Sequence, residues 1–270
     1  MKVVTRMAIM MEEIVWNESE SLMIPDISEY ACAGFCPVCR ETHFLEQGGA
    51  REHCFLLLKI LEQKGRIDFY APEQQADRRL SLDYLFGEAR GQMFGVLECK
   101  DYAGEITVLK AFSGQYNGIW EVDGWVPPLL DVEQFDQMVC DIDRQIKELG
   151  NRISCLTEGK ERQQLTGQRK KLSQGLMKQI HALYQVRNFR SEVKPLSDFF
   201  PSGIPAGAGD CCAPKLLNEA VRRNLIPVSL AEFYWGGPNR SGTREHGSFY
   251  AACAEKCRPI LGFMLCGIAS

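Results

Sequence analysis

Apolar side chains recur with helical spacing through one long stretch of this chain. The first set alternates spacings of four and three: Phe135, Val139, Ile142, Ile146, Leu149, Ile153 and Leu156. The second set comes after a break at residues 157–160: Leu165, Leu172, Leu176, Ile180 and Leu183. Each set occupies one face of a helix. Two such helices joined by a short turn that contains a glycine predict a long antiparallel helical hairpin, which we assign to residues 131–194.

Shorter apolar runs on both sides of this hairpin predict an α/β core. The β-prone runs 91–100 and 105–114 are separated by Asp-Tyr-Ala-Gly, and turn residues between two such runs favour a β-hairpin. Beyond the helices we expect a helix at 211–224, a strand at 228–237, and a loop leading into an apolar helix at 246–267. The core is therefore assigned to residues 91–130 and 195–270.

Residues 1–90 form a separate N-terminal segment in this prediction. Residues 1–30 show little periodicity and are expected to be irregular, and residues 32–43 are expected to form a loop. From residue 51 the chain is apolar at helical spacing until Gly65, a residue type that commonly ends helices. We therefore expect one helix in this segment.

Composition excludes a few classes of protein and leaves most of them open. The chain has 270 residues, 45% of them hydrophobic, and a formal net charge of -4, so nucleic acid would have to be bound by a local basic surface. The sequence contains no apolar run of membrane-spanning length and no export signal, so we expect a cytoplasmic protein without a membrane partner. In that compartment its 12 cysteines favour packing or metal binding over disulfides.

The C-terminal cysteines are candidates for a metal site. Cys211 and Cys212 lie where a loop enters a predicted helix, Cys253 and Cys257 lie where a second loop enters a second helix, and His246 is just upstream. Thiolates are favoured at the start of a helix, where unpaired amides point at them. Two such pairs brought together would bind Zn²⁺ tetrahedrally. The alternative is that these are buried cysteines without a metal.

A second candidate cluster lies near the N-terminus. Its members are Cys32, Cys36, Cys39, His43, His53 and Cys54. Cys36 and Cys39 flank a knuckle-like turn that can present two thiolates to one metal, and His53 or Cys54 could complete the ligand set. The alternative is a free surface loop. The remaining cysteines lie in apolar contexts and are expected to be packing residues: Cys99, Cys140, Cys155 and Cys266.

The order of the predicted core elements resembles the zinc-dependent, cytidine-deaminase-like fold. That fold has a β-hairpin, a helix that opens with a ligand, a strand, and a helix that opens with paired cysteines. Its first helix opens with His-x-Glu or Cys-x-Glu, and its second with Pro-Cys-x-x-Cys. The string CCAPKLLNEA resembles the first motif and CAEKC the second. The resemblance implies a mixed-sheet, deaminase-like core interrupted by the helical hairpin.

This chain departs from those motifs in two respects. Its second cysteine pair has three intervening residues in place of two, and with Cys212 as ligand Pro214 stands where the proton-shuttling glutamate belongs. A zinc-bound water needs a group that moves its proton. Asp210 and Glu232 are the carboxylates we expect closest to the site, whereas Glu219 is expected on the surface. Each of the three could instead be purely structural.

A basic stretch accompanies the second predicted helix. Residues 160–190 carry eight basic side chains and a single acidic one, Glu161. Arg169, Lys170 and Lys171 are the centre of this stretch and are candidate contacts to RNA. A solvated helix face is the alternative explanation of such a charge run.

Several longer strings resemble the N-terminal accessory region of RluA-family pseudouridine synthases. They are GQMFGVLECKDYAGEITVLKAFSGQYNG, GWVPPLLD, GAGDCCAPKLLNEA, LAEFYWGG and HGSFYAACAEKCRPILGFML. The resemblance covers roughly residues 91–267 and implies a setting in RNA modification. The catalytic domain of that family, with its His-Arg-Leu-Asp motif, is absent from this sequence. Its chemistry is therefore not carried over, and the chain is either a free-standing version or a piece of a longer protein.

Three functions follow from these observations. The first is a zinc-binding, deaminase-like domain that acts on RNA or a nucleobase. The second is a non-catalytic module that binds RNA or a partner, such as a pseudouridine synthase domain. The third is a structural protein that forms homodimers through the apolar stripes of the helical hairpin.

Overall fold

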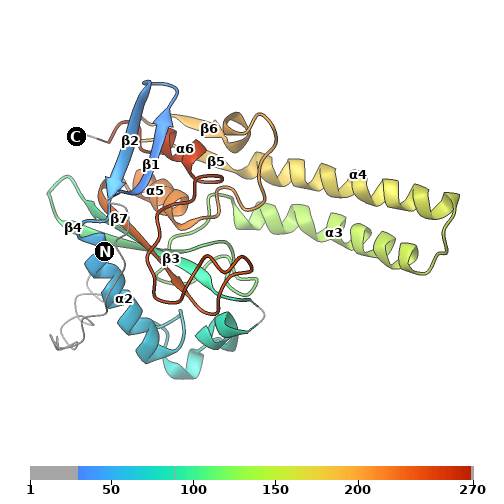
Figure 1. The fold of residues 1–270 in the computed structure, drawn as a ribbon, viewed down its shortest axis with the longest axis horizontal. Coiled ribbons are helices and arrows are strands. Elements are labelled where there is room, and N and C mark those ends of the chain that lie inside the picture. The colour runs from blue at the N-terminus through green and yellow to red at the C-terminus, as the bar shows by residue number, and fades with distance from the viewer. Residues whose placement is uncertain (1–29, 88, 269–270) are drawn as a thin grey trace.

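The computed structural model describes residues 30–87 and 89–268 (Figure 1). The irregular segment expected at residues 1–30 lies, apart from Tyr30, outside the described residues. The strands are β1 (Tyr30–Cys36), β2 (Glu41–Glu46), β3 (Gln92–Lys100), β4 (Ile106–Phe112), β5 (Gln185–Arg187), β6 (Val193–Pro195) and β7 (Ile226–Trp235). The helices are α2 (Ala50–Lys64), α3 (Val132–Ser154), α4 (Lys160–Leu183), α5 (Cys212–Arg222) and α6 (Arg258–Met264). Short 3₁₀ turns are η1 (Glu73–Gln75), η2 (Arg78–Leu80), η3 (Leu82–Phe86) and η4 (Leu196–Phe199).

The central sheet has the strand order β4-β3-β7, and both of its pairings are antiparallel. The mixed sheet expected from the sequence is therefore wrong for the described residues. The reason is that β7 returns along β3 in the opposite direction, with Gly95 opposite Glu232 and Met93 opposite Tyr234. The structure is thus an α/β fold built around antiparallel strands.

The two faces of this sheet are covered by different helices. Because side chains alternate along a strand, Leu97 and Leu230 face one side, with α5 and α6, while Phe94 and Phe233 face the other, with α2. Figure 1 shows α5 and α2 on opposite sides of the sheet. Each side encloses its own apolar core, and the face toward α5 also holds the candidate site.

The N-terminal cysteine segment is a β-hairpin, whereas the sequence predicted a loop. β1 and β2 pair antiparallel from Cys36 and Glu41 outward, and Arg40 takes a left-handed conformation in the turn between them, with φ of 63°. β1 packs against α6 from the other end of the chain. This contact buries Ala31 and Cys32, so the order of the segment depends on a tertiary partner.

Helices α3 and α4 lie side by side and project from the core (Figure 1). Asp131 caps α3 by accepting a hydrogen bond from the Gln134 amide at 3.0 Å. Leu165 and Leu176 of α4 are buried, and the apolar stripe of α3 is half-buried. No helix in the described part of the chain, α3 and α4 included, is both long enough and apolar enough to cross a membrane.

A buried lysine on β4 supplies a test of this core. Lys110 is 3% exposed, and its Nζ donates to the Tyr70 hydroxyl at 2.8 Å. Burial lowers the pKa of Lys110 to about 8, against the opposing effect of Asp123. Between about pH 8 and pH 10.5, Lys110 is therefore protonated in the unfolded chain but mostly neutral in the folded chain. As a result, this residue makes the free energy of unfolding rise with pH in that window.

We expect Lys110→Met to be more stable relative to wild type at neutral pH than at high pH. The free energy of unfolding of the variant minus that of wild type should fall by about 2 kcal/mol between about pH 7 and about pH 10, measured by urea unfolding. Lys100→Met on neighbouring β3 is the matched control, because Lys100 is exposed. An equal effect of Lys110→Met at both pH values would contradict the prediction.

Candidate metal centres

The first candidate metal centre joins the two ends of the described chain. Its ligand atoms come from Cys36, Cys39, His43 and Cys266 and all lie within 4.8 Å of one another. The Cys39 sulfur lies 3.0 Å from His43 Nε2 and 3.6 Å from the Cys266 sulfur. For Zn–S bonds of about 2.3 Å, two sulfurs on a tetrahedron are about 3.8 Å apart. Three sulfurs and one imidazole at these separations form a donor set that could hold a metal ion.

The hairpin and α6 together position these four ligands. Cys36 ends β1, Cys39 lies in the turn, and His43 lies on β2. Cys266 reaches them because α6 packs closely on β1, where Gly34 meets Gly262. A Cβ on Gly262 would collide with the backbone of β1, so glycine is required at this crossing.

Electrostatics in the first centre favour a thiolate at Cys36. Burial opposes ionisation, but hydrogen bonds from the backbone of Cys39 and Val38 and from the Cys39 and Cys266 thiols lower the pKa of Cys36. Burial raises the pKa of Cys266 to about 12. The nearby Cys266 sulfur raises the pKa of Arg190, so a guanidinium lies beside this ligand. A cation there would offset the net negative charge of a zinc ion bound by three thiolates.

The sequence prediction of this first centre was only partly right. Cys36, Cys39 and His43 come together, but the fourth residue of the group is Cys266, which was expected to be a packing residue. His53 lies 3.4 Å from Glu98 instead. The other two cysteines predicted for this cluster are also elsewhere: Cys54 donates to the Ala231 carbonyl, and Cys32 is buried in the core.

The second candidate metal centre is formed by three cysteines. The sulfurs of Cys211, Cys253 and Cys257 lie within 4.8 Å of one another, with Cys253 and Cys257 3.5 Å apart. Cys211 stands at the N-cap position of α5, and Cys257 stands at the N-cap position of α6. Hydrogen bonds from Cys211 and Cys257 lower the pKa of Cys253 to about 2. Ionisation is therefore favoured at Cys253, and the three sulfurs form a donor set that could hold a metal ion.

A buried carboxylate lies beside the second centre. Glu232 of β7 is 5% exposed, and its Oε1 accepts a hydrogen bond from the Ala213 amide at 2.8 Å. Burial raises its pKa to about 7, and the charge of Cys253 acts in the same direction. Gly95 lies opposite on β3, where a Cβ would crowd the Glu232 side chain and Cys212. The sheet thus leaves room for a carboxylate at the start of α5.

Two of the predicted ligands lie outside the second centre. Cys212 is fully buried, and its thiol donates to the Met93 carbonyl at 3.3 Å, because its position on α5 faces the sheet. His246 contacts the ring of Trp235, and its Nδ1 accepts from the Gly236 amide at 3.2 Å. Neither belongs to a group of residues in the described chain that could hold a metal.

The other predicted site residues have varied surroundings. Asp210 precedes Cys211, but its Oδ1 accepts from the Tyr184 hydroxyl at 2.7 Å. Glu219 was expected on the surface and is instead buried, with an ion pair to Arg223 at 2.6 Å. Arg169, Lys170 and Lys171 are all exposed on α4. Two cysteines expected to pack, Cys140 and Cys155, are exposed as well.

Comparison of the chain with protein-family models, with curated proteins and with solved structures gives no match. The candidate site is therefore interpreted from its own geometry.

Proposed function

We propose that this chain is a zinc protein of RNA modification whose second metal centre catalyses hydrolytic deamination of a nucleobase. The observation that carries the proposal is the meeting of three thiols from two chain segments with a buried carboxylate, Glu232. Three protein ligands leave one position of a tetrahedral zinc for water or substrate, which is the arrangement of catalytic zinc sites. In such a site bound zinc lowers the pKa of water and so supplies a nucleophile at neutral pH.

The placement of Glu232 supports a role in proton transfer. In the deaminase motif Cys-x-Glu, the glutamate stands two residues after the ligand. With Cys211 as the ligand, that position is Ala213 in this chain. The Glu232 carboxylate is bound to the amide of that same residue. A glutamate from β7 thus lies at the start of α5, next to the residue that stands at the motif's glutamate position.

The proposed reaction consumes one water and releases one ammonia. A C–O bond forms at the ring carbon, the C–N bond to the exocyclic amine breaks, and no oxidant or reductant is required. Ala213 fixes Oε1 of Glu232, so Oε2 is the atom left to accept a proton from water and to pass it to the departing amine. Burial raises the pKa of this carboxyl, which favours a group that can both accept and donate a proton.

The order of elements supports a deaminase-like core. The β3–β4 hairpin is followed by α5 with Cys211 at its start, then β7, then α6 preceded by the other two cysteines. In this interpretation α3 and α4 form a helical hairpin inserted between β4 and α5. The resemblance to the accessory region of RluA-family synthases favours a role in RNA modification. The exposed Arg169, Lys170 and Lys171 would contact the RNA.

The first metal centre has a different role in this proposal. Its four protein ligands would complete a tetrahedral zinc and leave no position for substrate, as in structural zinc sites. Such a zinc would fasten the β1–β2 hairpin to the turn after α6.

Metal analysis is the first test of the proposal. We expect about two zinc ions per purified chain, from one four-ligand and one three-ligand centre. Cys253→Ser together with Cys257→Ser should remove about one of them and abolish ammonia release from cytidine, cytidine 5′-monophosphate and a short cytidine-containing RNA. Cys140→Ser is the control, because Cys140 is exposed on α3 and lies outside both centres. Unchanged zinc content in the double variant would rule out the second centre.

A non-catalytic module that binds RNA or a partner is the alternative, and the exposed basic residues of α4 fit it as well as they fit the first proposal. In that case RNA would bind wild type and the Cys253/Cys257 variant equally, and no ammonia would be released. Neutralising Arg169, Lys170 and Lys171 would then weaken binding and flatten its salt dependence.

A further inference from the structure

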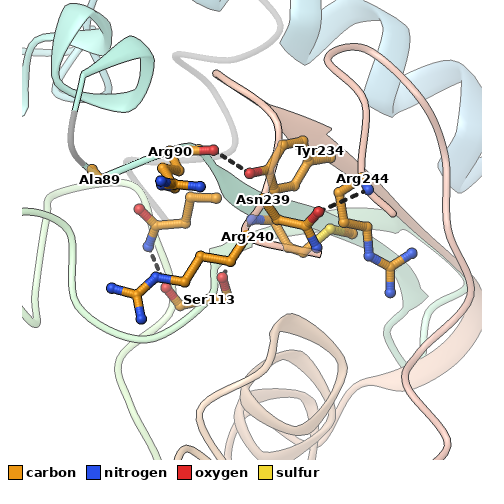
Figure 2. Close-up of a pocket in the computed structure, with 10 residues that line it drawn as sticks. Ala89, Arg90, Ser113, Tyr234, Asn239, Arg240 and Arg244 are labelled. Atoms are coloured by element: carbon orange, nitrogen blue, oxygen red, sulfur yellow. Dashed lines mark hydrogen bonds between the residues drawn. The ribbon is translucent and has the colours of Figure 1, made fainter. Parts of the chain in front are cut away.

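A pocket of about 420 Å³ opens beside strands β3 and β7 of the central sheet (Figure 2). It lies between the start of β3, the residue after β4 and the end of β7. Its lining is unusually rich in arginine and includes Arg90, Arg240, Arg244, Gln92, Ser113 and Tyr234. No acidic side chain is among its lining residues in the described chain.

Hydrogen bonds hold the walls of this pocket in place. The Tyr234 hydroxyl donates to the Gly237 carbonyl at 2.8 Å and also contacts the carbonyl of Arg90, whose φ of 65° is left-handed. Asn239 Oδ1 accepts from the Arg244 amide at 3.1 Å and so fixes the turn that presents the arginines (Figure 2). A non-glycine residue with a left-handed backbone, as at Arg90, is often found at a functional site.

The positive charge of the pocket is only partly balanced within the described chain, where Arg244 interacts electrostatically with the buried Glu232 carboxyl. None of the guanidinium groups of Arg90, Arg240 and Arg244 forms an ion pair there. Arg244 lies over the ring of Tyr250, 4.0 Å from its centroid, which orients it without cancelling its charge. Three arginines that line one cavity favour an anion with several oxygens as its ligand, since arginine binds phosphate through paired hydrogen bonds.

The strand register connects this pocket to Glu232. Met93 and Tyr234, which line the pocket, are opposite one another, and the pair Gly95 and Glu232 follows two residues along on the same face. Side chains two residues apart on a strand are separated by about 7 Å. Tyr250, whose ring lies under the Arg244 guanidinium, donates its backbone amide to the backbone carbonyl of Glu232 at 3.0 Å. A ligand bound in the pocket would therefore lie no farther from Glu232, the proposed proton carrier, than the length of one nucleotide.

We infer that this pocket binds a phosphate group of the substrate and holds the attached nucleoside toward Glu232. The inference rests on the proposed function for its catalytic meaning, and it narrows the substrate class to nucleotides or RNA as opposed to free bases and nucleosides. The phosphate is either the terminal group of a mononucleotide or a phosphodiester of a strand.

Binding measurements with and without the phosphate test this assignment. We expect cytidine 5′-monophosphate or a short single-stranded RNA to bind at least about tenfold more tightly than cytidine, with an affinity that falls as salt rises. Arg240→Gln with Arg244→Gln should remove that advantage and leave cytidine binding unchanged. Arg152→Gln on α3 is the matched control, because Arg152 is exposed and remote from the pocket.

The zinc-site variant separates this inference from the proposed function. Cys253→Ser with Cys257→Ser should lose zinc and ammonia release but keep the preference for phosphate, because the arginines are not ligands. Binding of the mononucleotide assigns a terminal phosphate, and binding of RNA alone assigns a phosphodiester. Equal binding of cytidine and its phosphate together with unweakened RNA binding in the arginine variant would overturn the inference, whatever the outcome for zinc.

Discussion

Cys266→Ala should detach the β1–β2 hairpin from the C-terminal turn and destabilise the chain by more than about 4 kcal/mol, a loss typical of a removed metal site. The reason is that Cys266 alone brings the turn after α6 into the ligand set with Cys36, Cys39 and His43. Zinc content should fall by about one ion per chain. Amide hydrogen exchange should accelerate across residues 30–46, and chelation of wild type should have the same local effect.

Cys99→Ala is the control for this experiment. Cys99 and Cys266 are both fully buried free cysteines, but Cys99 lies in the apolar core and outside both metal centres. Its replacement should cost about 1 kcal/mol through lost packing, with zinc content unchanged. If the two variants matched in zinc content and in stability, the first centre would be a packed cysteine cluster and not a metal site.

The pattern of apolar residues was sufficient to predict much of the core. The runs 91–100 and 105–114 correspond to β3 and β4, and the expected strand at 228–237 corresponds to β7. These strands are long and apolar, so their local pattern agrees with their burial. The β1–β2 hairpin was missed because its strands are ordered by α6, which is distant in sequence.

The ligand sets show where local sequence reasoning ends. Cys36 and Cys39 could be paired from their spacing alone, because a short turn holds them together. Cys266 could not be assigned to this group from sequence spacing, since its approach to Cys36 and Cys39 depends on two glycines that let α6 pack on β1. The only available sign was Gly262 within an otherwise apolar helix, which marks a close helix contact.

The choice between Cys211 and Cys212 was within reach of the sequence. Cys212, Leu216 and Ala220 are spaced by four, so they share one face of α5, and all three are fully buried. That pattern turns Cys212 toward the sheet and leaves Cys211 for the metal centre. Glu232 was chosen from the sequence only as a carboxylate near the predicted cysteine site. The structure adds that it alternates with Leu230 on the buried face of β7, where an isolated carboxylate needs a partner or a function.

Glu232→Gln should reduce ammonia release by about 10²- to 10⁴-fold while zinc content and folding stay close to wild type. Glutamine has the same shape, and its amide oxygen can still accept the hydrogen bond from Ala213 that anchors the start of α5. It cannot carry a proton between water and a departing amine. Turnover, zinc content and melting temperature are the measurements, each made on wild type and on the variant.

Two further variants separate proton transfer from a merely structural role. Glu219→Gln changes another buried glutamate, one that is paired with Arg223, and it should keep near-normal turnover. Glu232→Ala removes the partner of the Ala213 amide and should lose stability as well as turnover, because a buried donor is left unpaired. If Glu232 only anchored α5, the glutamine variant would remain active and the alanine variant alone would fail. That outcome would assign the proton to a different carboxylate, with Asp210 the next to test.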